Sequence, residues 1–184
     1  MAATTTTDRT DSRETRVEDR LADLFDAHHE RLHRLALRLS RDTEGARDLV
    51  QETFLRAARR VSTVPDGASS EEAWLVRVLV NVCRDVNRRK RVRGIVKPVT
   101  DADLTTGGFE NAIVARATVR KALAMLSARG RAVLVLHSLE ERPVAEVAKL
   151  LGVSRVTVRW HLATARRRLA IWLKPPQERQ EHEE

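Results

Sequence analysis

The chain has 184 residues, a length that allows one domain or two small ones. Aromatic residues make up only 3% of it and tyrosine is absent, so its core must be built from leucine, valine and alanine. With seven glycines, five prolines and few alternating β-branched runs, the composition argues against a β protein and favours an all-α fold. The formal net charge of +8 indicates a polyanionic partner.

The excess positive charge is concentrated in two places, residues 88–93 and 155–174, while acidic residues gather at 19–26 and 178–184. Two separated basic segments predict a polyanion that is bound at two points, as a nucleic acid would be. An anionic membrane is the competing partner. Neither basic segment carries the bulky apolar face of a membrane-surface helix, so nucleic acid is favoured.

Residues 1–16 are polar and rich in threonine, without the apolar segment of a secretory signal, and we expect them to be disordered. No apolar run reaches transmembrane length, so the expected location is cytoplasmic. The single cysteine, Cys83, excludes an intrachain disulfide. It lies in an apolar-periodic segment, where a small buried side chain is favoured over a redox sensor.

Three amphipathic helices are predicted in the first half of the chain, over residues 21–39, 46–58 and 71–93, with a turn-rich loop at 62–70. Further helices are predicted over 113–126 and 129–139. Between the two halves, residues 94–110 lack periodicity and contain Pro98, Gly107 and Gly108, as a flexible linker does. The expected organisation is a tail at 1–16, helical domains at 17–93 and 111–173, and a polar tail at 174–184.

A helix-turn-helix is predicted over residues 143–168. Pro143 suits the first turn of a helix, Gly152 can take the positive φ that ends it, and Ser154 is a natural N-cap for the next helix. That second helix is rich in arginine, as a helix in a DNA major groove would be. A helical hairpin with a solvated basic face is the plainer alternative. The cations are Arg155, Arg159, Arg166, Arg167 and Arg168.

A literal H-E-x-x-H motif occurs at residues 29–33, the pattern that sets two zinc ligands on one helix face with glutamate as general base. Arg31 places a cation inside the motif, and no downstream third-ligand motif completes a site. A zinc metalloprotease with His29, Glu30 and His33 as its centre is therefore disfavoured.

Three segments in order carry a resemblance to a known family: residues 46–57 (ARDLVQETFLRA), 73–85 (AWLVRVLVNVCRD) and 126–168. They are similar to the polymerase-binding helix, the promoter-melting helix and the DNA-reading domain of bacterial RNA polymerase sigma factors. The chain resembles the small, two-domain extracytoplasmic-function (ECF) type over residues 21–173.

The resemblance implies two helical domains, similar to sigma region 2 and sigma region 4, and a non-enzymatic factor that initiates transcription. The implied partners are core RNA polymerase, promoter DNA and an anti-sigma factor. No cofactor, metal or catalytic residue is expected. The polymerase-binding helix would present a polar face, although for this helix read alone an ordinary solvated face is favoured, and Phe54 would be core. The implied polymerase-binding residues are Asp48, Gln51, Glu52, Leu55 and Arg56.

Recognition of the −10 promoter element would fall to the loop at 62–70 and the following helix. In this family such a loop holds a flipped base, and an unstacked base needs a pocket to offset its cost. Trp74 lies on the apolar stripe and is favoured as core over a stacking platform. The implied −10 contacts are Ser62, Asp66, Arg77, Asn81, Arg84, Arg88 and Arg89.

Recognition of the −35 element would fall to the second helix of the helix-turn-helix, with Val158, Leu162 and Leu169 inward. The sequence departs from the family pattern at Arg155, Trp160, His161 and Thr164, so the DNA sequence that is read is not predicted. The implied contacts are Arg155, Thr157, Arg159, Trp160, His161, Ala163, Thr164 and Arg166.

A helix-turn-helix regulator that binds duplex DNA without polymerase is the main rival. Such a regulator has no need of the helix at 46–57 or of a basic melting helix, and this favours the sigma factor.

Overall fold

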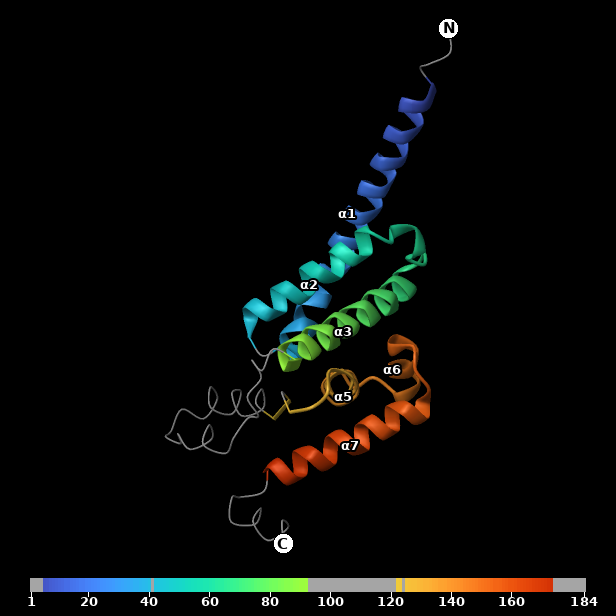
Figure 1. The fold of residues 1–184 in the computed structure, drawn as a ribbon. Coiled ribbons are helices and arrows are strands. Elements are labelled where there is room, and N and C mark those ends of the chain that lie inside the picture. Colours follow the sequence, from blue (N-terminus) through green and yellow to red (C-terminus); the bar gives the residue numbers. More distant parts are fainter. Residues whose placement is uncertain (1–4, 41, 93–121, 124, 174–184) are drawn as a thin grey trace.

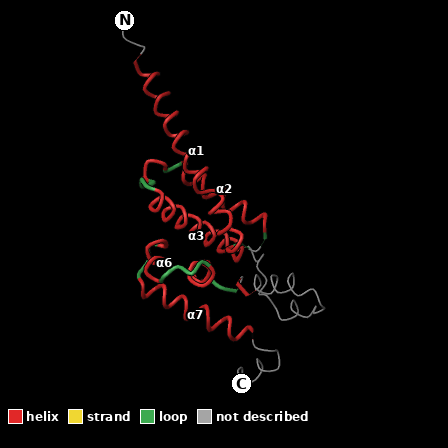
Figure 2. The backbone as a smooth tube through the Cα atoms, turned by 180° about the vertical axis from the view of Figure 1, so that it is seen from behind, coloured by secondary structure: helices red, strands yellow, loops and turns green. Residues whose placement is uncertain are grey.

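The computed structural model describes residues 5–40, 42–92, 122–123 and 125–173, and this part of the chain forms helices and turns without a strand (Figure 1, Figure 2). The expected all-α class is confirmed. The expected linker, most of the expected helix at 113–126 and the C-terminal tail lie outside the described residues. The elements are α1 (Thr5–Leu39), α2 (Thr43–Ala58), the 3₁₀ turn η1 (Val61–Thr63), α3 (Ala68–Val92), α5 (Ala128–Leu134), the π-helical turn η3 (Val135–Leu139), α6 (Val144–Leu151) and α7 (Arg155–Leu173).

The first helix, α1, begins at Thr5, so the structure differs from the expectation that residues 1–16 form a disordered tail. Residues 5–39 contain no glycine or proline. Once the packed end, with Leu32, Leu35 and Leu39 fully buried, has nucleated the helix, propagation into a segment without breakers costs little. Figure 1 shows the N-terminal part of α1 extending beyond the other helices.

The second helix, α2, confirms the helix predicted at 46–58 and begins at an N-cap. Asp42 accepts a hydrogen bond on Oδ1 from the backbone N–H of Gly45 at 2.6 Å, which satisfies an otherwise free donor of the first turn. Leu49, Val50 and Phe54 are buried toward the core. Phe54 is therefore a core residue, as expected.

The third helix, α3, is buried on two sides. The sequence predicts one apolar stripe, and its members Leu75, Leu79 and Val82 are buried. Val76 and Val80 are buried as well, on a stripe turned by about 100° from the first. The reason is tertiary: α3 packs against α1 and α2 on one side and against α5 and α6 on the other, as both views show (Figure 1, Figure 2).

One continuous hydrophobic core therefore runs through both halves of the chain. It joins residues of α1, α2 and α3 to residues of α5, α6 and α7, such as Val133, Leu136 and Val147, all of which are fully buried. The expectation of two helical units did not include this contact between them. The linker boundaries themselves stay a prediction.

A polar cluster fixes the start of α3 to α1. Glu71 is buried and accepts hydrogen bonds from Arg20 Nη2 at 2.8 Å, while its other oxygen lies 3.0 Å from His28 Nε2. Arg20 also reaches Asp66 in the preceding turn at 3.2 Å. His28 and Arg20 together lower the pKa of Glu71, so this carboxylate stays ionised in the folded protein.

The helix-turn-helix is present as α6 and α7. Pro143 is the N-cap of α6 rather than a member of its first turn, because its ψ of 148° is not helical. Gly152 ends α6 in the left-handed conformation with φ 64°, as expected. Ser154 caps α7 by accepting a hydrogen bond on Oγ from the N–H of Thr157 at 3.0 Å, also as expected.

Gly152→Ala tests the turn. We expect a loss of about 1 kcal/mol or more in the free energy of unfolding, because alanine is strained at positive φ. A Cβ there would also lie 3.0 Å from Cδ of Arg77. Urea denaturation measures the loss. Gly67→Ala is the comparison, because Gly67 has φ 93° with nothing within 4 Å of an added Cβ, so its loss of stability reports backbone strain alone. A loss well below about 0.5 kcal/mol in Gly152→Ala would contradict a strained left-handed position.

Glu71→Gln tests the anchor of α3. The pKa of Glu71 is lower in the folded protein than in the unfolded chain, where a glutamate has a pKa of about 4.3. The ionised carboxylate therefore stabilises the fold above about pH 4.3, and this stability is lost as the pH falls through the folded-state pKa. The variant should therefore lose about 1.5 kcal/mol or more at pH 7, the usual worth of charged hydrogen bonds. Thermal melts from pH 7 to pH 3 should show the deficit shrinking only below about pH 4.3. A deficit that is independent of pH would argue against the ionised carboxylate.

Candidate nucleic-acid and protein interfaces

The outer face of α2 carries the residues expected to bind a protein partner. Asp48 and Gln51 are exposed, and Leu55 is exposed to 45% although it is apolar. Glu52 and Arg56 are half-buried and are joined by an ion pair at 2.8 Å. Arg56 also reaches Asp85 of α3 at 3.2 Å, so it ties α2 to α3 rather than standing free.

The turn before α3 is shorter than the loop predicted at 62–70. η1 covers Val61–Thr63, Gly67 takes a φ of 93°, and residues 68–70 already belong to α3. Ser62 is exposed and the side chain of Asp66 is fully exposed. The turn therefore presents short polar side chains to solvent, while Arg20 and Glu71 fix its position.

Along α3 the five residues expected to meet DNA divide into two groups. Arg84, Arg88 and Arg89 are exposed near the C-terminal end of the helix. Arg77 and Asn81 are half-buried. The side chain of Arg77 lies over Gly152, so its position depends on the second half of the chain.

The outer face of α7 is cationic with an apolar centre. Arg155, Arg159 and Arg166 are exposed, and Trp160 is exposed to 61% with its ring edge-on to His161 at 4.8 Å between centroids. Ala163 is exposed beside them. Val158 and Leu162 are buried and Leu169 is partly buried, as expected.

Three residues expected to face DNA on α7 are half-buried against other side chains. Thr157 is half-buried, and its Oγ1 lies 2.8 Å from the capping Oγ of Ser154. His161 and Thr164 are half-buried and line a hollow of about 160 Å³ between α7 and the start of α5. Desolvation and the charge of Arg129 lower the pKa of His161, which favours a neutral imidazole at neutral pH.

Val156 was missed by the sequence analysis. It is exposed to 71%, and with Trp160 and Ala163 it has i, i+4, i+7 spacing on the outer face of α7. The spacing is visible in the sequence, but an apolar residue at helical spacing is ordinarily assigned to the core. An apolar stripe among arginines suits contact with thymine methyl groups in a major groove.

The residues of the H-E-x-x-H motif have other partners in the structure. The rings of His29 and His33 stack on one another at 6.0 Å, and His29 also stacks on Phe25 at 4.4 Å. Glu30 pairs with Arg34, and Arg31 pairs with Glu72 and Glu140. In the described ranges no three His, Cys, Asp or Glu side chains are grouped so that they could hold a metal ion.

Two further sequence expectations concern the interior and the membrane. Cys83 is buried, and burial raises the pKa of its thiol, which favours the unreactive protonated form. Trp74 is half-buried and packs against the hydrophobic core. Among the helices of the described segments, none combines the length and apolar character needed to span a bilayer.

Two families match the chain, one in its first half and the other in its second half. The sigma-70 region 2 family matches residues 24–93, which include all of α2 and α3. The sigma-70, region 4 family matches residues 116–169, which include the helix-turn-helix. The two matches contain every residue expected to bind polymerase or DNA.

Similar whole proteins and folds are known. ECF RNA polymerase sigma factor SigM of Mycobacterium tuberculosis is 37% identical over 152 residues, 80% of this chain and 74% of SigM. SigL of the same organism is 36% identical over 154 residues, 82% of this chain and 87% of SigL.

The fold is shared with CnrH, solved in complex with the cytosolic domain of CnrY, at a TM-score of 0.54 and 25% identity over 83% of this chain and 86% of that chain. It is also shared with the sigma factor RpoE of Bartonella quintana, solved in complex with the anti-sigma factor NepR, at a TM-score of 0.52 and 23% identity over 94% of this chain and 99% of that chain. With both matched regions in order on one chain and curated relatives of this identity, the protein belongs to the ECF-type sigma factors of the sigma-70 family.

Proposed function

We propose that this chain is an alternative sigma factor: it binds core RNA polymerase, directs it to promoters, helps to open the DNA and so initiates transcription. One observation carries the proposal. A single chain with matches to region 2 and region 4 presents an exposed polar face on α2 and exposed arginines on α3 and α7. It acts without chemistry of its own, since RNA synthesis belongs to the polymerase.

Polymerase docking is assigned to the outer face of α2. Asp48 and Gln51 supply polar contacts, and the exposed Leu55 supplies the apolar centre that a specific interface requires. Glu52 contributes beside them. Arg56 acts indirectly, because its ion pairs with Glu52 and Asp85 hold α2 in place on α3.

Opening at the −10 element is assigned to the turn before α3 and to α3 itself. Ser62 and Asp66 are exposed hydrogen-bonding groups on a turn that is fixed to α1 and suits capture of an unstacked base. Arg84, Arg88 and Arg89 bind phosphates of the separated strand. Arg77 and Asn81 lie deeper on the same helix.

Reading of the −35 element is assigned to α7. Arg155, Arg159 and Arg166 make charged contacts, and Val156 joins Trp160 and Ala163 as an apolar stripe toward thymine methyl groups. Thr157 acts as part of the helix cap. His161 and Thr164 act from the rim of the hollow behind Trp160.

An anti-sigma factor is a further proposed partner. CnrH and RpoE, which share the fold, were both solved as complexes, RpoE with an anti-sigma factor. The exposed apolar side chains Leu55 and Trp160 are surfaces that such a partner could cover.

The deciding experiment is run-off transcription with purified bacterial core polymerase on the gene's own upstream region. A specific transcript that depends on this chain supports the proposal. No specific transcript together with no co-purification with core would overturn it. The rival regulator is distinguished by a gel shift, since a regulator binds duplex DNA alone whereas this chain should need core polymerase.

Asp48→Arg combined with Gln51→Ala tests the docking face. Both side chains are exposed, so the fold should be unaffected, while the reversed charge should weaken core binding about a hundredfold, as loss of an interface anchor does. Binding is measured by fluorescence anisotropy of labelled protein titrated with core. Glu18→Arg, a charge reversal of an exposed residue on α1, is the control and should bind normally. Normal binding by the double variant would remove α2 from the interface.

Arg159→Ala and Arg166→Ala separate base contacts from phosphate contacts on α7. Loss of a base contact costs about 1–3 kcal/mol and relaxes specificity, so Arg159→Ala should bind wild-type and −35 mutant promoters more equally. Arg166→Ala should instead remove a phosphate contact. It should weaken binding to all promoters alike and lower the slope of affinity against salt concentration by about one. Filter binding of the holoenzyme at several salt concentrations measures both. Two variants with identical profiles would contradict this assignment.

A further inference from the structure

The hollow between α7 and the start of α5 has the size of a site for one small molecule. Its volume is about 160 Å³. An apolar cavity of about 150 Å³ takes up benzene inside a protein, so one six-membered ring fits this space. No proposed contact with polymerase or DNA uses the interior of the hollow, because His161 and Thr164 act from its rim.

The inner walls of the hollow are apolar. Leu126, which precedes α5, and Ala165 of α7 are both buried and line it. The side chain of Trp160 lines it as well, although this residue is largely exposed on its other side. A ring placed against these walls loses contact with water, which favours an aromatic ligand over a wholly polar one.

The rim of the hollow carries a cation and two hydroxyl groups. Arg168 is exposed and lines the hollow together with Ser127 and Thr164. Ser127 Oγ accepts a hydrogen bond from the N–H of Gly130 at 3.1 Å, and its own O–H can still donate. Among the described residues, no aspartate or glutamate lines the hollow and none pairs with Arg168. The rim therefore suits a ligand with an anionic group.

The wall that His161 forms is also subject to positive charge. Desolvation and the charge of Arg129 lower the pKa of His161, so its imidazole is neutral at neutral pH and offers one donor and one acceptor. A cation that entered the hollow would meet Arg129 and Arg168 without a lining carboxylate to offset them. An anion is attracted by both arginines.

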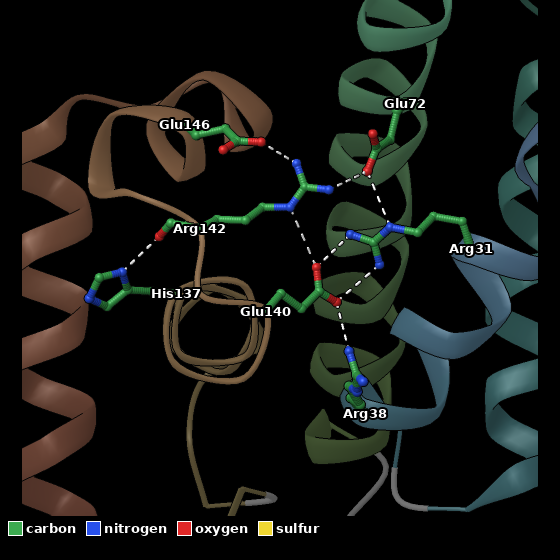
Figure 3. Close-up of polar contacts among 7 residues, drawn as sticks. All are labelled: Arg31, Arg38, Glu72, His137, Glu140, Arg142 and Glu146. Atoms are coloured by element: carbon green, nitrogen blue, oxygen red, sulfur yellow. Dashed lines mark hydrogen bonds and ion pairs between the residues drawn. The ribbon is translucent and has the colours of Figure 1, made fainter.

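The wall on the side of α5 is held in place by the first half of the chain. Arg131 of α5 is buried and donates to the carbonyl oxygens of Leu39 and Leu123. Beyond η3, Glu140 accepts two hydrogen bonds from Arg31, at 3.0 and 2.5 Å, as Figure 3 shows. A ligand does not have to order a wall that is already fixed, and this lowers the entropic cost of binding.

We propose that the hollow binds a small aromatic carboxylate, with its ring against the buried walls and Trp160 and its carboxylate at Arg168. The hydroxyls of Ser127 and Thr164 donate to the carboxylate from the same rim. The hollow offers the space of one ring, whereas a stable protein interface covers about 800 Å² on each partner, so a small molecule is favoured over a protein. Binding is a property of the chain alone.

The ligand has a consequence for promoter recognition, which rests on the proposed function. Trp160 lines the hollow and also belongs to the apolar stripe on the outer face of α7. A carboxylate at Arg168 adds negative charge next to the helix that attracts phosphates, so the ligand weakens −35 binding. By linkage, bound promoter DNA weakens ligand binding by the same factor.

Benzoate is the probe for the first test, in an NMR titration of the isotope-labelled full chain. The indole N–H signal of Trp160, identified with Trp160→Phe, should shift with a dissociation constant on the order of 1 mM, as suits a ligand of this size. Benzyl alcohol lacks the charge and should bind about fivefold more weakly, and benzylamine, with the opposite charge, more weakly still. Acetate lacks the ring and should not shift the signal.

Two results of this titration would overturn the proposal. One is the absence of any shift of the Trp160 signal at benzoate concentrations about twenty times the expected dissociation constant. The other is equal binding of benzoate and benzylamine, because a cationic rim cannot treat the two charges alike.

Two pairs of variants on α7 locate the ligand. Ala165→Leu fills the hollow and should weaken benzoate binding by about tenfold or more, whereas Ala170→Leu makes the same change at an exposed position outside it and should bind normally. Arg168→Gln should weaken benzoate about fivefold and leave benzyl alcohol unchanged. Arg167→Gln removes the same charge outside the hollow and should have a smaller effect on benzoate.

The arginine pair decides by itself if Ala165→Leu fails to fold, because both arginines are exposed. Equal losses of benzoate affinity in Arg168→Gln and Arg167→Gln would remove the carboxylate from Arg168. Normal binding by a folded Ala165→Leu would remove the ring from the hollow. Either result would overturn the site as proposed.

Filter binding of the holoenzyme to promoter DNA tests the consequence for the −35 element. Saturating sodium benzoate should weaken binding by up to about fivefold relative to the same concentration of sodium acetate, which matches the ionic strength. Arg168→Gln should remove this difference. Equal binding in the two salts would overturn the coupling. The NMR titration needs neither polymerase nor DNA, so the ligand site would stand even if the run-off experiment failed.

Discussion

The burial of α3 on two sides is the constraint on which the other features of the structure depend. Its first stripe, with Leu75 and Leu79, and its second, with Val76 and Val80, are both buried, and the helix packs against α1 and α2 as well as α5 and α6. A helix that carries two apolar stripes cannot leave one in water without losing about 25 cal/mol for each Å² exposed. This single helix therefore connects both halves and, through Arg77, links the proposed −10 contacts to the position of the helix-turn-helix.

Arginine serves two distinct purposes in this protein. Arg31, Arg131 and Arg142 are half-buried or buried and are paired with carboxylates or carbonyl oxygens between the halves. The exposed arginines of α3 and α7 face solvent, where charge favours an anionic polymer. The number of arginines therefore overstates how many are available to DNA, because some of them are paired inside the fold.

The proposed recognition surface of α7 also differs in kind from what its charge alone indicates. Val156 and Trp160 are exposed to 71% and 61% and form an apolar centre among the arginines. Thr157 and His161, in contrast, are partly withdrawn into the cap and the hollow. Charged groups set affinity for the phosphate backbone, while the apolar centre and Arg159 offer contacts that differ between base pairs.

By itself the sequence determined the local features. Helical periodicity predicted α2, α3 and α7, and Gly152 and Ser154 predicted the turn between α6 and α7, because these signals lie within a few residues of each other. The residues of the proposed interfaces stay predictions, and the structure adds the exposed Val156 to them. Only the tertiary structure decided the second buried side of α3 and the pairing of Arg31 and Arg38 with Glu140 across 109 and 102 residues. Contacts between residues so distant leave no periodic signal in a single sequence, since their geometry depends on how the helices pack.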